Sequence, residues 1–272
     1  MKGEILLAAG NFLCPGPGIN KEVNVSVLHT GWVETNANRV TRGADKATIE
    51  LPLLVGHIQH PLGDVYIDAG LGNTTREGTF PRFPLSPRNV TIPEGSTIAE
   101  QAPSTPRTVL TTHLHYDHTG GLLDLTHDTE VWTTEAEWQS VRTSNVAFPE
   151  GRMREAVTWR PVNMEAGQRN ERLGRPAIDV HGDGSIWYLS TPGHTPGSAS
   201  VLVHAADAAW LFIGDIAWVD EHLNGARRPQ WVSLLVDGRP RAHKRALQWA
   251  RSLRQQCPSL EIVAGHEPRW TE

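Results

Sequence analysis

The sequence has little of several features that would assign it to a class at once. Only two of its 272 residues are cysteines, Cys14 and Cys257, which excludes a framework of several disulfides. We expect two free thiols in a reducing compartment, with one bridge between them as the alternative. The apolar run ILLAAGNFL near the N-terminus is too short to span a membrane and lacks a convincing small-residue cleavage site. These absences favour a cytoplasmic protein without a membrane partner.

Positive charge is also scarce. The chain has 25 lysines and arginines against 30 acidic residues, a formal net charge of −5, and no long basic run. Because binding to a phosphate backbone usually needs a basic patch, we expect no nucleic-acid partner. The 39% of hydrophobic residues is ordinary for a globular protein. We expect one domain over 1–272, in which the Pro-, Gly-, Ser- and Thr-rich segment 72–106 is a surface loop or excursion, a cap beside a binding site or an oligomer contact.

Short apolar runs bounded by turn residues predict strands. They cover 24–29, 51–59, 64–69, 108–112, 185–190, 199–204, 209–214 and 260–265. The sequence HPLG at 60–63 predicts a hairpin turn. Helices are predicted over 134–144, where Thr134 and Glu137 have capping-box spacing, and over 240–256, which ends before Pro258. Strands in groups with helices between them predict layered α/β structure with a mixed sheet.

The most informative motif is H-x-H-x-D-H within TTHLHYDHTGG. It places His113, His115, Asp117 and His118 within six residues. Imidazole nitrogens and a carboxylate oxygen in this number suit zinc and similar divalent ions. The alternative, a histidine-rich surface loop, requires so dense a run to have arisen without a role. We therefore predict a metal site here, which needs further ligands from elsewhere in the chain.

Three further candidate ligands each follow a predicted strand. They are His194 after SIWYLSTPG, Asp215 after AWLFIG and His266 after LEIVAG. Because sites in layered α/β proteins gather beyond the carboxyl ends of strands, these segments can converge with the histidine run. Taken singly, a histidine after a strand is more often structural, and an aspartate there more often caps a turn. His222 is a further histidine close to Asp215 in the sequence.

Seven ligands are too many for one tetrahedral ion and predict two ions. We assign His113, His115 and His194 to the first ion, and Asp117, His118 and His266 to the second. Asp215 would bridge them. Asp68, which ends the strand in YIDAG, is expected to accept the free N–H of a metal-bound histidine, the alternative being a turn carboxylate.

These residues resemble the metallo-β-lactamase superfamily. The resemblance rests on YIDAG, THLHYDHTGG, TPGHTPGS, GD at 214–215 and GH at 265–266, in that order, and extends from about residue 23 to the C-terminus. It implies a four-layer αβ/βα sandwich of two mixed sheets with the metals at one edge. A complete H-x-H-x-D-H with a bridging aspartate is unlike the true β-lactamases and resembles the lactonase, glyoxalase II and organophosphate hydrolase branches. Among these, IELPLLVGHIQHPLGDVYIDAG and the closing helix followed by EIVAGHEP look like the N-acyl homoserine lactonases. Zinc is the expected metal, with iron, manganese or cobalt as alternatives.

The resemblance implies a dinuclear hydrolase that opens lactones or cleaves carboxylic esters, as the quorum-quenching lactonases do. Those lactonases usually carry a tyrosine three residues after the bridging aspartate, where this chain has Trp218, and Ser198 replaces a histidine often found after TPGHTPG. We expect Trp218 to donate its N–H to the oxyanion and Asp117 to deliver a proton to the leaving alkoxide. Trp231 and the weaker candidates Phe80, Phe83 and Phe148 would line an apolar pocket.

Other functions fit the same residues. The site could act on phosphotriesters, thioesters or β-lactams, hold a small ligand without turnover as a sensor, or carry iron for redox chemistry, although His115 in place of a glutamate disfavours the diiron flavoprotein branch. The native substrate is left open. So is the oligomeric state, for which a homodimer is one alternative.

Overall fold

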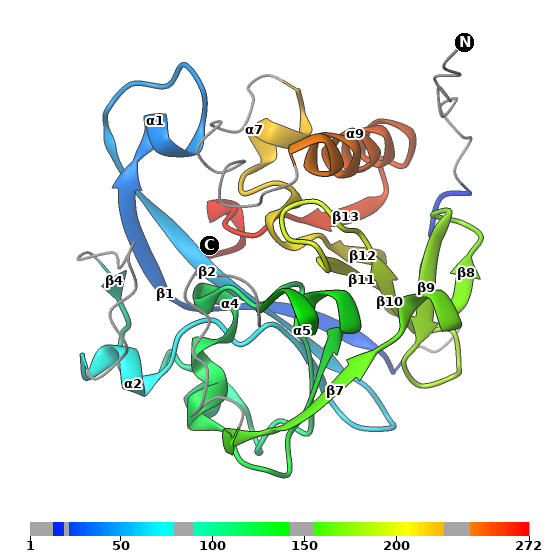
Figure 1. Ribbon diagram of the computed structural model, residues 1–272, viewed down its shortest axis with the longest axis horizontal. Coiled ribbons are helices and arrows are strands. Elements are labelled where there is room, and N and C mark those ends of the chain that lie inside the picture. The colour runs from blue at the N-terminus through cyan, green and yellow to red at the C-terminus, as the bar shows by residue number, and fades with distance from the viewer. Residues whose placement is uncertain (1–12, 19–21, 79–89, 142–154, 226–239, 272) are drawn as a thin grey trace.

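Two β-sheets form the centre of the structure, a computed structural model that describes residues 13–18, 22–78, 90–141, 155–225 and 240–271 (Figure 1). The first sheet has seven strands in the order β4-β1-β2-β3-β5-β6-β7. Their bounds are β1 Asn24–Asn36, β2 Thr48–Gln59, β3 Val65–Ile67, β4 Val90–Thr91, β5 Thr108–Leu110, β6 Glu130–Thr134 and β7 Thr158–Val162. The strands β3, β5, β6 and β7 run parallel, whereas β1, β2 and β4 add antiparallel pairs. This sheet is therefore mixed.

The second sheet has six strands in the order β13-β12-β11-β10-β9-β8. Their bounds are β8 Gln168–Asn170, β9 Arg175–Asp179, β10 Ile186–Ser190, β11 Ala199–His204, β12 Ala209–Phe212 and β13 Leu260–Val263. The pair β12 and β13 is parallel and the other pairs are antiparallel. The second sheet is mixed as well.

Helices cover the outer faces of the sheets. The helix α9 lies over the strands of the second sheet, and α4 and α5 follow strands of the first (Figure 1). The α-helices are α1 Ala37–Val40, α2 Asn73–Arg76, α3 Ile98–Gln101, α4 Tyr116–Thr119, α5 Glu135–Val141, α7 Asp220–Leu223 and α9 Pro240–Gln256. The 3-10 helices are η1 Gly120–Asp124, η2 Met164–Ala166, η3 Gly214–Ile216 and η4 Pro268–Thr271. None of the helices in these described ranges combines the length and the apolar character needed to cross a membrane.

The hydrophobic core follows from the alternation of side chains along each strand. Ile67 and Leu110 point into the space between the sheets, where they pack with Tyr188 and Val201 of the second sheet. Their neighbours Tyr66 and Val109 point the other way and pack with Ile98 and Leu122 outside the first sheet. On the far side, buried residues of α9 such as Leu253 cover the outer face of the second sheet. The result is the expected sandwich of two mixed sheets between helical layers.

The eight strands and two helices expected from the sequence are present. The expected turn at 60–63 closes β2 onto β3, with the Gly63 N–H donating to the His60 carbonyl. Strands β6 to β9 were not expected, and β7 contains Pro161 at the edge of its sheet, where a missing N–H costs no ladder bond. Segment 72–106 holds α2, β4 and α3, so part of it is regular structure. Residues 79–89 of that segment lie outside the described residues.

The expectation of two free thiols was wrong. Cys14 and Cys257 form a disulfide, with their Cα atoms 5.3 Å apart. The segment before β1 lies along the second sheet, where the Gly18 N–H donates to the Ala205 carbonyl and His204 Nδ1 to the Gly16 carbonyl. This path brings Cys14 to the end of α9 across 243 positions of sequence, which no local pattern reveals. The expected cytoplasmic location loses the support that free thiols gave it.

Candidate metal centre

Each candidate ligand sits on a loop that leaves the carboxyl end of a strand. His113 and His115 follow β5, and the short helix α4 then carries Asp117 and His118. The other loops follow β10, β12 and β13, and bring in His194, Asp215 and His266. The structure thus brings all seven predicted residues to one edge of the sandwich. They form two groups, and within each group the potential ligand atoms all lie within 4.8 Å of one another.

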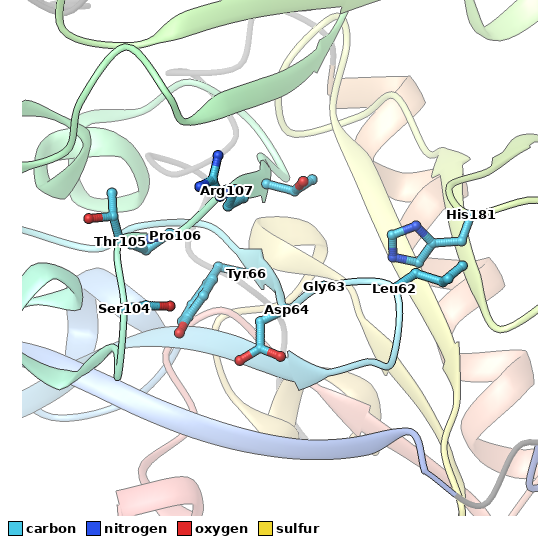
Figure 2. Close-up of a pocket in the computed structure, with 10 residues that line it drawn as sticks. Leu62, Gly63, Asp64, Tyr66, Ser104, Thr105, Pro106, Arg107 and His181 are labelled. Carbon is cyan, nitrogen blue, oxygen red and sulfur yellow. The ribbon is translucent and has the colours of Figure 1, made fainter.

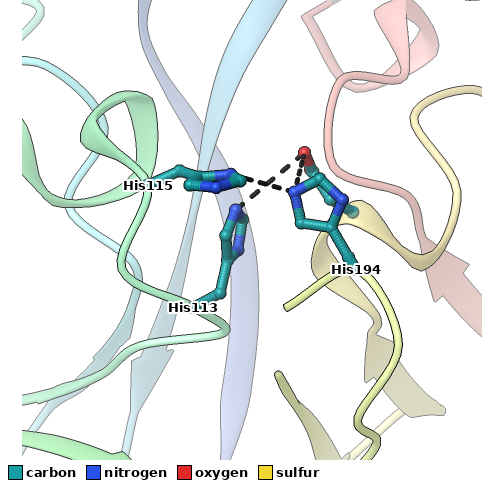
Figure 3. Close-up of side chains that lie close together, drawn as sticks. His113, His115 and His194 are labelled. Carbon is teal, nitrogen blue, oxygen red and sulfur yellow. Dashed lines mark hydrogen bonds and ion pairs between the residues drawn. The ribbon is translucent and has the colours of Figure 1, made fainter. Parts of the chain in front are cut away.

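The first group consists of His113, His115 and His194 together with Asp215 (Figure 3). The rings of His113 and His115 come from one loop and that of His194 from another, and all three point toward a common space. His115 Nδ1 lies 2.9 Å from His194 Nε2. His194 Nε2 lies 3.2 Å, and His113 Nε2 4.0 Å, from Asp215 Oδ2. Three ring nitrogens and one carboxylate oxygen therefore surround one point.

The second group consists of Asp117, His118 and His266. Asp117 Oδ2 lies 3.7 Å from His266 Nε2 and 4.0 Å from His118 Nε2. The other oxygen of Asp215, Oδ1, lies 3.2 Å from His118 Nε2 and 3.4 Å from His266 Nε2. Asp215 consequently turns one carboxylate oxygen to each group. This is the geometry that a bridging ligand requires.

Hydrogen bonds on the far side of the rings fix their tautomers. His118 Nδ1 donates to Asp68 Oδ2 at 2.8 Å, and His266 Nδ1 donates to the Pro52 carbonyl at 3.0 Å. The Thr112 hydroxyl donates to Asp68 Oδ2, so that its oxygen can accept from His113 Nδ1 at 3.1 Å. Each of these bonds places the proton of the neutral ring on Nδ1. Nε2 is therefore the atom through which each ring would bind a metal.

Asp68 thus lies where the sequence placed it and contacts more than was expected. Besides His118 and the Thr112 hydroxyl, it accepts the Thr112 N–H at 2.6 Å through Oδ1. Its φ of 61° lies in the left-handed region, which few residues other than glycine adopt. Such a conformation costs about 1 kcal/mol or more and persists where surrounding contacts determine it. Asp68 adopts this conformation at the end of β3. From there its carboxylate binds the His118 ring directly and the His113 ring through the Thr112 hydroxyl.

Gly265 allows the loops to approach one another closely. A Cβ atom at this position would lie 2.4 Å from Asp215 Oδ1, which is closer than real contacts permit. A side chain here would displace the carboxylate from between the two groups. The glycine in front of His266 is therefore a steric requirement of the centre.

The electrostatics of the centre follow from burial and from the carboxylates. Burial lowers the pKa of His115 to about 4, and the neighbouring His194 adds to the effect. The pKa of Asp215 lies well below its ordinary value, because the charges of His118, His194 and His266 outweigh the opposing effect of burial. The pKa of His118 is raised, because Asp215 and Asp68 outweigh its burial. The Asp215 carboxylate is thus ionised, and its charge attracts cations.

Buried polar atoms in the centre lack hydrogen-bond partners in a way that a cation would satisfy. Among the described residues, His113 Nε2, His118 Nε2 and Asp215 Oδ1 are buried without a hydrogen bond. Leaving such atoms unsatisfied is costly, and each has a lone pair that faces the shared space. Five imidazoles and two carboxylates form a donor set suited to zinc and its neighbours among the transition metals. The residues present therefore fit two divalent ions.

Trp218 borders the centre, and its N–H has a partner. The indole Nε1 donates to Asp215 Oδ2 at 2.8 Å, and the ring meets that of His266 edge-on at 5.7 Å. His222 lies apart from the ligands, with Nε2 at 3.1 Å from the Thr41 hydroxyl. Trp231, Phe80, Phe83 and Phe148, which the sequence suggested for a pocket, lie outside the described residues.

Two residues that support the centre were not identified from the sequence. Thr112 falls at the end of an expected strand, and its hydroxyl connects His113 to Asp68. Glu137 was expected to cap its helix, but its carboxylate accepts hydrogen bonds from Leu114, Thr195 and Gly197. The only feature of Thr112 in the sequence that indicates its role is its position next to His113. For Glu137, the capping-box spacing from Thr134 predicted a bond within the helix and gave no indication of the distant partners.

A separate cavity of about 440 Å³ lies at the other end of the parallel strands (Figure 2). Its lining includes Asp64 and Tyr66 where β3 begins, Arg107 before β5, and His181. Burial and the charge of Asp64 raise the pKa of Tyr66 to about 12, so its phenol stays protonated at neutral pH. None of the seven candidate ligands lines this cavity. It is distinct from the candidate metal centre.

Comparisons with known proteins agree with the fold. The Metallo-beta-lactamase superfamily pattern matches residues 67–266. An N-acyl homoserine lactonase AttM of Azorhizobium caulinodans is 24% identical over 268 residues, which covers 91% of this chain and 94% of the relative. A solved N-acyl homoserine lactone hydrolase, with the product N-hexanoyl-L-homoserine bound at the catalytic metal center, has a TM-score of 0.70 at 15% identity, covering 91% of this chain and 94% of that chain. AidC, a dizinc quorum-quenching lactonase, has a TM-score of 0.56 at 12% identity, covering 94% and 92%.

Proposed function

The chain belongs to the metallo-β-lactamase superfamily, and from this membership and the geometry of its centre we propose that it is a two-metal hydrolase that opens lactones. Cleavage of open-chain carboxylic esters is the closely related alternative. One observation carries the proposal. Asp215 turns Oδ2 toward His194 and Oδ1 toward His118, so one carboxylate serves both groups of ligands. A bridging aspartate in addition to six further ligands is the arrangement that the resemblance to lactonases implies.

The reaction needs a nucleophile at neutral pH and an activated carbonyl. Two divalent ions, with zinc expected, would supply both by acidifying water and by Lewis acidity. His113, His115 and His194 would hold the first ion, and Asp117, His118 and His266 the second. Asp215 would fix the separation between the two groups. The contribution of the protein is to place these seven side chains before the substrate arrives.

Asp117 is proposed to transfer the proton that the leaving alkoxide needs. Its side chain is 37% exposed, whereas those of His118 and His266 are almost fully buried. Asp117 can therefore contact both the candidate metal centre and a substrate that approaches from solvent. In a lactone the leaving oxygen remains attached to the acyl part, so that ring opening yields a hydroxy acid.

Trp218 is proposed to act at the position where lactonases usually carry a tyrosine. Its N–H donates to Asp215 Oδ2, and an indole has a single donor. It can stabilise the substrate oxyanion only if this hydrogen bond is given up or shared. The same ring, edge-on to His266, provides an apolar wall beside the centre. We propose that Trp218 narrows the substrate range toward esters and lactones with apolar acyl groups.

The activity is tested with metal-loaded protein on a panel of lactones, aryl esters, thioesters, phosphotriesters and β-lactams. We expect hydrolysis of lactones with the highest kcat/KM and a hydroxy acid as product. His115→Ala, loaded in the same way, should lose at least about a hundredfold of that rate, because it removes a ligand of the first ion. Equal rates for His115→Ala and the unmodified protein would contradict the proposal. Preference for phosphotriesters would assign the site to another hydrolase class.

The role of Trp218 is tested separately with Trp218→Phe and Trp218→Tyr. If the N–H stabilises the oxyanion, the phenylalanine variant should lose about tenfold to a hundredfold in kcat with unchanged metal content, and tyrosine should restore part of the loss. If the N–H serves Asp215 alone, metal content should fall while kcat per bound metal is retained. The ratio of metal to protein, measured with the rate, separates the two outcomes.

A further inference from the structure

Helix α5 carries a buried carboxylate that faces away from its own helix. Thr134, the residue in front of the helix, accepts the Glu137 N–H through its hydroxyl oxygen at 3.1 Å, as in a capping box. In a complete box the glutamate side chain would return to the Thr134 N–H. Glu137 is 0% exposed and accepts other hydrogen bonds. Of the two hydrogen bonds of a capping box, the one from the Glu137 N–H to Thr134 is present, and the Glu137 carboxylate binds elsewhere.

The partners of Glu137 come from two loops that bear ligands. Oε1 accepts the N–H of Leu114, which lies between two of the candidate histidines, at 3.1 Å. Oε2 accepts the Thr195 hydroxyl at 2.6 Å and the Gly197 N–H at 3.0 Å, both in the loop after β10. One carboxylate therefore connects the loop of His113 and His115 with the loop of His194.

The contact between α5 and the second loop is close. The Thr134 hydroxyl donates to the Gly197 carbonyl at 2.7 Å, and Glu137 accepts the Gly197 N–H, so both backbone polar groups of Gly197 are bound at the start of α5. A Cβ atom on Gly197 would lie 2.1 Å from the Glu137 nitrogen, so only glycine fits. Burying a carboxylate costs free energy that three hydrogen bonds offset in part. The buried Glu137 carboxylate therefore holds the two loops against each other.

We infer that Glu137 is a positioning residue that fixes the two loops of the first group relative to each other, so that His113, His115 and His194 are arranged for one ion. It does not touch the ion or the substrate. The inference rests on the proposed two-metal function. It predicts that the first ion depends on Glu137 and that the second, held by Asp117, His118 and His266, does not.

The test isolates each group with a background variant. His266→Ala weakens the second group and leaves the first, and His115→Ala does the reverse. Metal-free protein of each background, with and without Glu137→Gln, is titrated with Co²⁺ and followed by its visible absorption. The amide of Glu137→Gln keeps one acceptor for Leu114 but presents an NH₂ group to the Gly197 N–H. We expect first-group affinity to fall by about tenfold to a hundredfold and second-group affinity to change by less than about threefold.

A matched control is the glutamate of another capping box. Glu100 accepts from the Thr97 N–H and hydroxyl, both at 3.0 Å, and from Arg76 of α2, so its partners lie outside the loops that bear candidate ligands. Glu100→Gln in the His266→Ala background should leave Co²⁺ affinity unchanged. A merely structural Glu137 would lower thermal stability and weaken both groups alike or neither, and either result would overturn the inference.

A gentler variant keeps the test decisive if Glu137→Gln does not fold. Thr195→Val removes one donor and leaves the Leu114 and Gly197 bonds in place. It should weaken the first group severalfold and spare the second, and equal weakening of both would count against the inference. Failure of the unmodified protein to bind two ions would contradict the proposed function as well, whereas normal binding with unaffected variants would contradict the inference alone.

Discussion

The two groups of candidate ligands are supported in different ways. In the second group, hydrogen bonds act directly on the rings, as Asp68 does on His118 and the Pro52 carbonyl on His266. In the first group, Glu137 acts on the loops that carry the rings, and His113 has a ring partner in Thr112. Ring partners select a tautomer and an orientation, whereas backbone partners set the distance between loops. A metal centre can thus be organised by hydrogen bonds to the ligand rings and by hydrogen bonds to the loops that carry them. Loss of the first kind disturbs one ring, and loss of the second kind changes the distance between loops.

The most severe change removes what the two groups share. Asp215→Ala deletes the carboxylate that faces both, so we expect metal content to fall for both ions and kcat to drop by about 10⁴-fold. Metal analysis and lactone hydrolysis measure the two effects. His222→Gln is the control, since His222 is equally buried and hydrogen-bonds Thr41. An Asp215→Ala protein that keeps two ions would mean that the groups do not depend on a common bridge.

A second pair of variants separates the groups by their ring partners. Asp68→Asn disturbs His118 directly and His113 through Thr112, so both ions should bind about tenfold to a hundredfold more weakly. Thr112→Val removes only the hydroxyl, and it should weaken the first ion severalfold with little effect on the second. Competition with a chelator measures both affinities. If Thr112→Val weakens the second ion as much as the first, the chain from His113 to Asp68 is not the relevant support.

The smallest effect concerns a carboxylate remote from both groups. The hydrogen bonds and charge of Arg76, with help from Thr97, lower the pKa of Glu100 to about 2, although burial opposes this. Because the folded pKa lies below the ordinary value of 4.5, its contribution is fully present above pH 4.5 and is lost as the pH falls toward 2. The pair is solvent-screened, so Glu100→Gln should cost about 1 kcal/mol or less at pH 7.

Thermal unfolding of the unmodified protein and Glu100→Gln between pH 7 and pH 3 measures this contribution. The difference in Tm should narrow as the pH is lowered. A difference that stays constant or widens would show that the charge of Glu100 is not its source. Glu100→Gln and the unmodified protein should bind metal with the same affinity. The affinity losses of the Asp68 and Thr112 variants are compared with this control.

The convergence of the candidate ligands and much of the fold were predictable because their signals are local. His194, Asp215 and His266 each follow an apolar strand and a glycine or a tight turn, and the dense run at 113–118 requires partners. Asp68 was found for the same reason, since it ends a strand within a recognisable motif. The parallel strands β6 and β7 were not expected, because they are short and Pro161 breaks the apolar pattern of one of them.

The supports that were not predicted share a different property. Glu137 satisfies a local rule at the level of sequence, and its side chain binds loops 23 and 60 positions away. Cys14 and Cys257 are neighbours only because the segment before β1 lies along the second sheet. Such contacts depend on the assembled tertiary structure, and a single sequence read by spacing and periodicity does not contain them.

The Cys14–Cys257 bond turns most of the polypeptide into a covalent ring. Six of the seven candidate ligands lie on that ring, and His266 lies on the short tail beyond it. A single peptide-bond cut within the ring leaves both pieces covalently joined until the cystine is reduced, whereas after a cut between Cys257 and His266 only non-covalent contacts, such as the His266 bond to the Pro52 carbonyl, hold that candidate ligand. Of the seven candidate ligands, His266 alone lacks this covalent protection.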